Sequence, residues 1–131
     1  MGKYPGYAGS LNPSGDIRII FQENGMMEVK MYTFRGMEPS VTDAVLNIHF
    51  GTTCNDTSLV GPHYWNEDKV SDLWNVEGGA VYDTLATGKP VGGFHMYNGY
   101  KAEDNVGHAV VAHGKDGSKI ACGILEYFVK L

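Results

Sequence analysis

Alternation of apolar and polar residues predicts the strand around which the rest of this chain is organised. In residues 44–50, Leu46 and Ile48 are apolar, and Asn47 and His49 occupy the positions that alternate with them. A period of two is that of a strand with one buried face. We therefore expect Leu46 and Ile48 to enter a core, with Asn47 and His49 side by side on the opposite face.

Similar patterns predict a fold made almost entirely of strands. We expect these at residues 16–21, 27–34, 80–86, 94–97, 106–113 and 119–129, with the start of another at residues 73–76. Asn24-Gly25 is a hairpin signal, and residues 114–117 form a second tight connection. No segment has sustained helical spacing with caps; residues 41–45 come nearest and are too short. Seven or eight strands predict an all-β antiparallel sandwich or flattened barrel.

Length and composition predict one globular domain. A chain of 131 residues is long enough to bury a core, and its 18 glycines are scattered as turn punctuation, with no internal repeat. Residues 1–15 are rich in glycine and proline and predict an irregular lead-in to a single domain at 16–131. The net charge of −5 argues against binding to nucleic acid. No apolar run is long enough to predict a membrane span.

The two cysteines help to predict whether the protein is cytosolic or extracellular. Residues 1–15 contain no hydrophobic signal region, so the protein is either cytosolic or a domain of a longer secreted chain. Cys54 and Cys122 are the only cysteines, which is typical of one structural disulfide; the alternative is two buried free thiols. Because disulfides persist in oxidising compartments, the first interpretation favours an extracellular protein.

Three histidines on or beside expected strands indicate a metal site on the outside of the β domain. They are His49, His63 and His113, and the two cysteines lie close to them in sequence. The alternative for each is an ordinary hydrogen-bonded histidine, which is our interpretation of His95 and His108. His108 is an odd number of residues from His113, so on one regular strand it faces away. We expect the aromatic residues Tyr64, Trp65 and Trp74 to pack, although Tyr64 and Trp65 lie beside His63.

Five motifs resemble, in order, the successive motifs of copper/zinc superoxide dismutases. They are Asn-Ile-His-Phe-Gly at 47–51, Gly-Pro-His at 61–63, Asp-Leu-Trp-Asn-Val at 72–76, Val-Val-Ala-His at 110–113 and Ala-Cys-Gly at 121–123. The resemblance covers nearly the whole chain from Asp16, and Gly-Pro-His followed by Asp-Leu-x-Asn-Val is its most specific part. It implies a Greek-key β-barrel with an immunoglobulin-like arrangement and a disulfide between Cys54 and Cys122.

The resemblance also implies a copper site with a changed ligand set. His49, His63 and His113 match three copper ligands, with His63 at the position that bridges copper to zinc, and Asn47 stands where the family has its first copper histidine. No other histidine lies between His63 and Asp72, so two zinc ligands are missing and no zinc is expected. Only residues 114–121 separate His113 from Cys122, so the family's long anion-guiding loop is absent. These departures resemble the copper-only branch, which includes tandem-repeat proteins.

Two further residues match family positions. Asp72 matches the zinc aspartate, and we expect it to hold the second nitrogen of His63; Glu67 is an alternative, and Asp72 could instead cap a turn. Lys119 stands where the family has an arginine beside copper, where it would attract superoxide; the alternative is a solvated strand residue. A water, the Asn47 oxygen or a repositioned His95 would complete the copper shell.

The resemblance therefore implies an extracellular copper-binding domain that disproportionates superoxide to oxygen and hydrogen peroxide. We expect its activity to be impaired because Asn47 replaces a copper histidine. Two alternatives are a non-catalytic copper carrier and a purely structural repeat domain. In either case, sibling repeats in a longer chain are expected partners.

Overall fold

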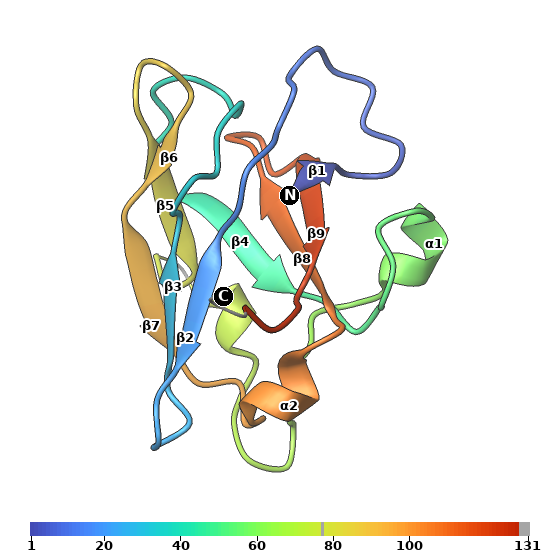
Figure 1. The fold of residues 1–131 in the computed structure, drawn as a ribbon, viewed down its shortest axis with the longest axis vertical. Helices are drawn as coiled ribbons and strands as arrows, with labels where there is room; N and C mark the ends of the chain where they lie inside the picture. Colours follow the sequence, from blue (N-terminus) through green and yellow to red (C-terminus); the bar gives the residue numbers. More distant parts are fainter. Residues whose placement is uncertain (77, 129–131) are drawn as a thin grey trace.

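Two antiparallel sheets make up the computed structural model, which describes residues 1–76 and 78–128 (Figure 1). One sheet has the order β1-β9-β8-β4-β5-β6, and the other has the order β2-β3-β7. The first comprises β1 (Gly2–Lys3), β9 (Lys119–Ile124), β8 (Ala109–His113), β4 (Ala44–Ile48), β5 (Val81–Thr84) and β6 (Pro90–Val91). The second comprises β2 (Arg18–Phe21), β3 (Met27–Lys30) and β7 (Gly93–Met96). The fold is an all-β sandwich, as the alternation predicts.

The predicted hairpin between β2 and β3 is confirmed. The strands pair from Arg18↔Lys30 to Phe21↔Met27 around the Asn-Gly turn. Gly25 has φ of 85°, and the Asn24 side chain accepts a hydrogen bond from the Met26 amide at 2.9 Å. Glycine adopts this left-handed conformation at little cost, which is why the dipeptide predicts the turn.

Several element predictions are wrong or too long. Residues 73–76 do not start a strand: η1 (Leu73–Asn75) is a 3₁₀ helix, because the Asp72 carboxylate caps it by accepting from the Trp74 amide at 3.0 Å. Two four-residue helices, α1 (Thr57–Val60) and α2 (Ala102–Asn105), were not expected, since single turns carry no periodic signal. β9 ends at Ile124, well before the expected end at Val129, which lies outside the described residues. The lead-in contributes β1, which pairs with β9.

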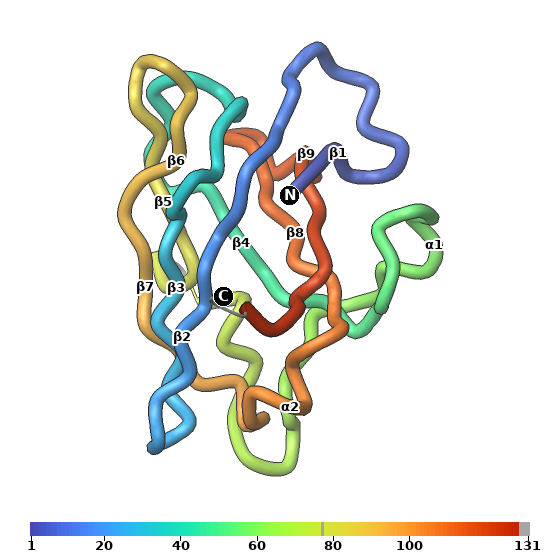
Figure 2. Tube along the Cα trace, in the orientation of Figure 1, coloured from blue at the N-terminus to red at the C-terminus, as the bar shows by residue number. Residues whose placement is uncertain are grey.

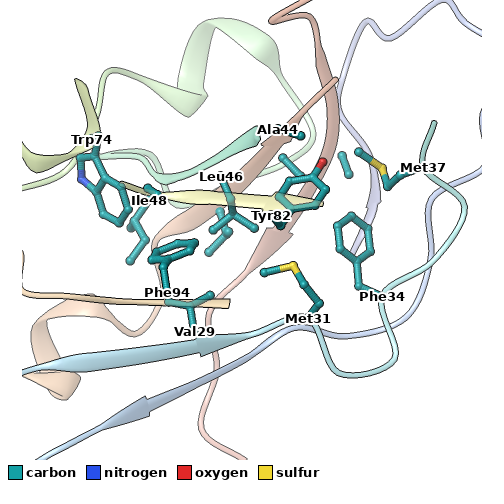
Figure 3. Close-up of a cluster of buried hydrophobic side chains, with 14 of the residues drawn as sticks. Val29, Met31, Phe34, Met37, Ala44, Leu46, Ile48, Trp74, Tyr82 and Phe94 are labelled. Carbon is teal, nitrogen blue, oxygen red and sulfur yellow. The ribbon is translucent and has the colours of Figure 1, made fainter. Parts of the chain in front are cut away.

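The main core lies between the two sheets (Figure 3). Leu46 and Ile48 of β4 are fully buried there, as the alternation predicts, and they meet Val29 and Phe94 from the three-stranded sheet. One face of β4 therefore supplies core packing. The other face is left to carry Asn47 and His49.

A second, smaller cluster covers the outer face of the six-stranded sheet, and it is made of residues Tyr4, Val60, Ala109, Val111 and Cys122. Tyr4 comes from the N-terminal segment and Val60 from α1. Figure 2 shows the loop that carries α1 beside the β8–β9 side of the sheet. This covering explains how polar side chains on the outer face become buried.

The predicted disulfide is present between Cys54 and Cys122, whose Cα atoms lie 5.8 Å apart. It ties the loop before α1 to β9. Within the described residues, no helix is long and apolar enough to cross a membrane. The disulfide is compatible with an extracellular protein.

Candidate metal centre

Asn47 lies between two of the predicted histidine ligands on the outer sheet face. β4 and β8 pair with Asn47 opposite Val111, and the His49 amide donates to the Ala109 carbonyl at 2.8 Å. Residues two apart on a strand lie about 6.6 Å apart and share a face. His49 is therefore next to Asn47 on β4, and His113 lies diagonally across from Asn47 on β8. Asn47 is 1% exposed and His49 is 2% exposed.

His63 joins this group through an isolated antiparallel bridge with His49. The Tyr64 amide donates to the Ile48 carbonyl at 2.8 Å, and the Phe50 amide donates to the Pro62 carbonyl at 2.8 Å. These flanking bonds make His49 and His63 a non-hydrogen-bonded pair, the type in which side chains approach most closely. Their ring centroids are 5.2 Å apart, with the planes at 88°.

Backbone carbonyls hold one ring nitrogen of two of the histidines. His49 Nδ1 lies 2.7 Å from the Gly61 carbonyl oxygen, and His113 Nδ1 lies 3.1 Å from the Val45 carbonyl oxygen. A carbonyl oxygen only accepts, so each Nδ1 carries the proton and each Nε2 keeps its lone pair. This is the arrangement in which metal-binding histidines are commonly held.

Asp72 caps a turn, which is one of the two roles considered for it, and it also lies beside His63. Its Oδ2 lies 3.9 Å from His63 Nδ1, an ion-pair distance rather than a hydrogen bond. The same carboxylate caps η1 and accepts from the Asn75 side-chain amide at 2.6 Å. Glu67 is exposed. The structure thus places Asp72 beside the third histidine, and its predicted role toward a metal-bound His63 stays a prediction.

Burial lowers the pKa of all three imidazoles, which favours their neutral forms. Burial lowers the pKa of His49 to about 4, with smaller contributions from the charges of His63, Lys119 and His113. Burial also lowers the pKa of His63, partly offset by Asp72. It lowers the pKa of His113 as well, partly offset by the bond to Val45. Neutral imidazole is the form that binds a metal.

A β-bulge brings Lys119 to this side of the sheet. β8 and β9 pair with Ala112 opposite Ala121 but with His113 opposite Lys119, so Ile120 is an extra residue in β9. Lys119 is an odd number of residues from Cys122, and without the bulge these two side chains would face opposite ways. Its Nζ instead lies 5.5 Å from the centroid of the Tyr4 ring, over the outer face. Lys119, which matches the family's arginine in sequence, thus lies near enough for its charge to influence the three histidines.

Within residues 1–76 and 78–128, three buried side-chain polar atoms have no hydrogen-bond partner, and they are Asn47 Nδ2, Asn47 Oδ1 and His49 Nε2. Leaving a buried polar group unpaired costs about 1–3 kcal/mol, so such groups are usually satisfied by a ligand, ion or water. The unpaired atoms belong to two neighbouring residues of the outer face, Asn47 and His49, which marks this spot as the centre of the candidate site.

The donor chemistry of this spot suits copper, because imidazole nitrogen serves copper well. Nevertheless, no three histidine, cysteine, aspartate or glutamate side chains in residues 1–76 and 78–128 are arranged so that they could hold a metal ion. The histidines share one face without forming a finished ligand shell. Copper binding therefore requires these side chains to move toward a common point, and the predicted ligand set stays a prediction.

The other two histidines, His95 and His108, make contacts of their own with residues other than the three predicted ligands. His95 lies on β7 of the other sheet, with Nε2 4.0 Å from Glu28 Oε2. His108 Nδ1 lies 2.8 Å from the Phe50 carbonyl oxygen, and its ring stacks on Tyr64 with centroids 3.9 Å apart. Tyr64 is a packing residue, as expected.

The two aromatic residues that follow in the sequence are also packed. Trp74 is buried in the core, and its Nε1 donates to the Tyr64 carbonyl at 2.9 Å. Trp65 is partly buried against the same core. The sequence interpretation of these indoles as packing residues agrees with the structure.

Sequence reasoning missed the groups that orient the histidines. The carbonyls of Val45 and Gly61 are backbone atoms, which every residue type has, so the sequence carries no signal for them. The Tyr82 hydroxyl donates to the His113 carbonyl at 2.7 Å from the core side, and nothing in the local sequence connects these residues. No family model, curated protein or solved structure matches this chain.

Proposed function

We propose that this chain is a copper-binding domain of the superoxide dismutase type, with slow disproportionation of superoxide to oxygen and hydrogen peroxide. The observation that carries the proposal is the hydrogen bonding of His49 and His113, whose Nδ1 atoms both face carbonyl oxygens. Their Nε2 lone pairs remain for a metal. An Asp72 carboxylate oxygen lies 3.9 Å from Nδ1 of the third ring, His63, which favours the same orientation there.

His49, His63 and His113 are the proposed copper ligands, with Asn47 at the fourth position. A bound copper ion would supply the one-electron redox chemistry that superoxide disproportionation needs. Three imidazoles suit Cu(I), whereas Cu(II) prefers a tetragonal set of four or more ligands. An amide at Asn47 is expected to weaken Cu(II) binding more than Cu(I) binding, and thereby to slow turnover.

The remaining roles fall to charged residues of the same face. Lys119 supplies a positive charge that attracts the superoxide anion in a chain whose net charge is −5. Asp72 lies beside His63 Nδ1, and zinc is not part of the proposal because two of the family's zinc ligands are missing. The disulfide supports an extracellular location, and sibling repeats in a longer chain are the proposed partners.

Copper titration of the oxidised protein tests the proposal. We expect about one Cu(I) per chain in competition with a chromophoric chelator, and we expect His113→Gln to weaken binding. His95→Gln is the matched control, because His95 is an exposed histidine on the other sheet. Failure of the parent protein to bind copper contradicts the proposal, as does equal binding by His113→Gln.

A copper carrier is the second candidate, and Asn47 is the observation that favours it. Without a fourth histidine the site suits storage of Cu(I) better than redox cycling. Measurement of superoxide consumption by the copper-loaded protein separates the two candidates. Bound copper with no turnover selects the carrier, and measurable turnover selects the enzyme.

A further inference from the structure

The turn between β8 and β9 carries two residues of the candidate site. His113 is the last residue of β8, Lys119 is the first residue of β9, and the two lie opposite each other. The Gly114 amide donates to the Ser118 carbonyl at 2.9 Å, which closes the turn. The position of this turn therefore decides where both side chains lie.

Tyr82 holds the turn from the inside of the protein. Its ring lies within the core between Leu46 and Phe34 (Figure 3), and the residue is 2% exposed. The hydroxyl donates to the His113 carbonyl oxygen at 2.7 Å in a buried hydrogen bond. A buried carbonyl that lost this donor would be left unpaired, so the bond constrains the backbone of His113.

Glu38 holds the same turn from a neighbouring loop. Its Oε1 accepts a hydrogen bond from the Lys115 amide at 2.8 Å. A Cβ atom on Gly114 would come within 2.2 Å of this oxygen, so a larger residue there would displace the Glu38 carboxylate from the turn. The Glu38 backbone is itself fixed, because its carbonyl accepts from the Thr84 hydroxyl at 2.6 Å.

These contacts lie where the pairing of β4 with β8 ends. The register runs from Ile48↔Val110 to Leu46↔Ala112, and Val45 and His113 are the next residues along. At this position the Val45 carbonyl oxygen accepts a hydrogen bond from His113 Nδ1, and the His113 carbonyl oxygen accepts one from the Tyr82 hydroxyl. Side-chain hydrogen bonds to these two carbonyls thus mark the end of the pairing, where the His113 ring turns its Nδ1 toward β4.

We propose that Tyr82 and Glu38 are positioning residues, which fix the β8–β9 turn so that His113 presents Nε2 and Lys119 presents its ammonium group to the site. Both residues act through the backbone of the turn, Tyr82 at the His113 carbonyl and Glu38 at the Lys115 amide. The part of this inference that concerns copper rests on the proposed function, and the part that concerns the His113 ring does not.

Nuclear magnetic resonance of the copper-free protein at constant pH tests the inference. In Tyr82→Phe and Glu38→Ala we expect His113 to lose its preference for the Nδ1-protonated tautomer. In Glu38→Ala we also expect faster hydrogen exchange of the Lys115 amide. Glu38→Gln keeps an acceptor oxygen and is expected to restore both signals. Tyr64→Phe is the matched control: it removes a tyrosine bond to the Asp104 carbonyl, and the His113 tautomer should not change.

Copper affinity provides the second measurement. Loss of an outer contact that orients a metal-binding histidine weakens metal affinity by about 10–100-fold. We expect this loss in Tyr82→Phe and Glu38→Ala and recovery in Glu38→Gln. An unchanged His113 tautomer in folded Glu38→Ala and Tyr82→Phe would overturn the inference. A parent protein that binds no copper contradicts the proposed function, while the tautomer measurement still decides the positioning role.

Discussion

His49 and His63 meet edge to face, with their ring centroids 5.2 Å apart, because a single antiparallel bridge joins their backbones. Such a pair brings Cα atoms to about 4.5 Å. Outside the pair, Gly61 anchors one ring and Asp72 lies beside the other. The two rings therefore meet through local backbone pairing, and each contribution can be tested in the copper-free protein.

The change Asn47→His restores the fourth imidazole that the resemblance implies. We expect it to strengthen Cu(II) binding and to raise superoxide turnover by about tenfold or more, since a factor of ten needs only about 1.4 kcal/mol. Chelator competition and superoxide consumption measure the two effects. An unchanged rate in a variant that binds copper would contradict the role given to Asn47.

The change Asn47→Leu should stabilise the copper-free protein. Both polar atoms of the Asn47 side chain are buried and unpaired, and each costs about 1–3 kcal/mol, whereas leucine has a similar shape and needs no partner. We expect urea unfolding to show a gain of about 1 kcal/mol or more, together with weaker copper binding.

Asn98→Leu is the control for that substitution. Asn98 is equally buried, but its amide donates to Asn105 Oδ1 at 2.7 Å and its oxygen accepts from the Tyr100 amide. Removal of these partners should destabilise the fold by about 1–3 kcal/mol. If both leucine variants lose stability equally, Asn47 is not an unpaired residue.

Acidification should destabilise the copper-free protein through His49. Burial lowers the pKa of His49 from 6.5 to about 4 in the folded state. Below about pH 6.5 the unfolded chain gains a proton that the folded protein does not accept. Stability therefore falls from pH 7 to pH 4, by up to about 3 kcal/mol from this residue.

Urea unfolding at several pH values measures the effect. The lowered pKa values of His63 and His113 act in the same direction. In His49→Gln we expect a shallower fall, and in His95→Gln we expect the fall of the parent protein. Identical pH profiles for the parent and His49→Gln would argue against a buried neutral imidazole.

Removal of the disulfide should cost much of the stability. Cys54 and Cys122 are separated by 68 residues, and closing a loop of that size corresponds to about 4 kcal/mol. We expect the double variant Cys54→Ser/Cys122→Ser to lose about this amount in urea unfolding. We also expect faster hydrogen exchange at Gly51, whose amide donates to Val60 within the tethered loop. Unchanged exchange there would show that the bridge does not order the loop.

Reversal of the charge of Lys119 should slow the reaction of the copper-loaded protein with superoxide. We expect Lys119→Glu to lower the rate by about tenfold at low salt, with a smaller loss at high salt because ions screen the charge. Lys69→Glu makes the same change in net charge at another exposed lysine. Equal losses in the two variants would mean that net charge, and not the place of Lys119, sets the rate.

Part of the fold follows from local pattern alone. Alternation places Leu46 and Ile48 in the core, and Asn24-Gly25 makes the predicted hairpin, because both signals depend on residues close in sequence. The expected strand at residues 73–76 fails for a related reason. Asp72 caps a short 3₁₀ helix, and a single turn leaves no periodic signal that separates it from a strand.

The sequence by itself determined the all-β class and the shared face of Asn47 and His49, because a period of two is a property of the strand alone. It also predicted the cysteine pair, because the chain has only two cysteines. Only the tertiary structure decided that His63 lies against His49 and that a bulge at Ile120 turns Lys119 toward the same face. Strand pairing and register arise from contacts between distant segments. The carbonyls that orient the histidines belong to the backbone, and every residue type supplies one.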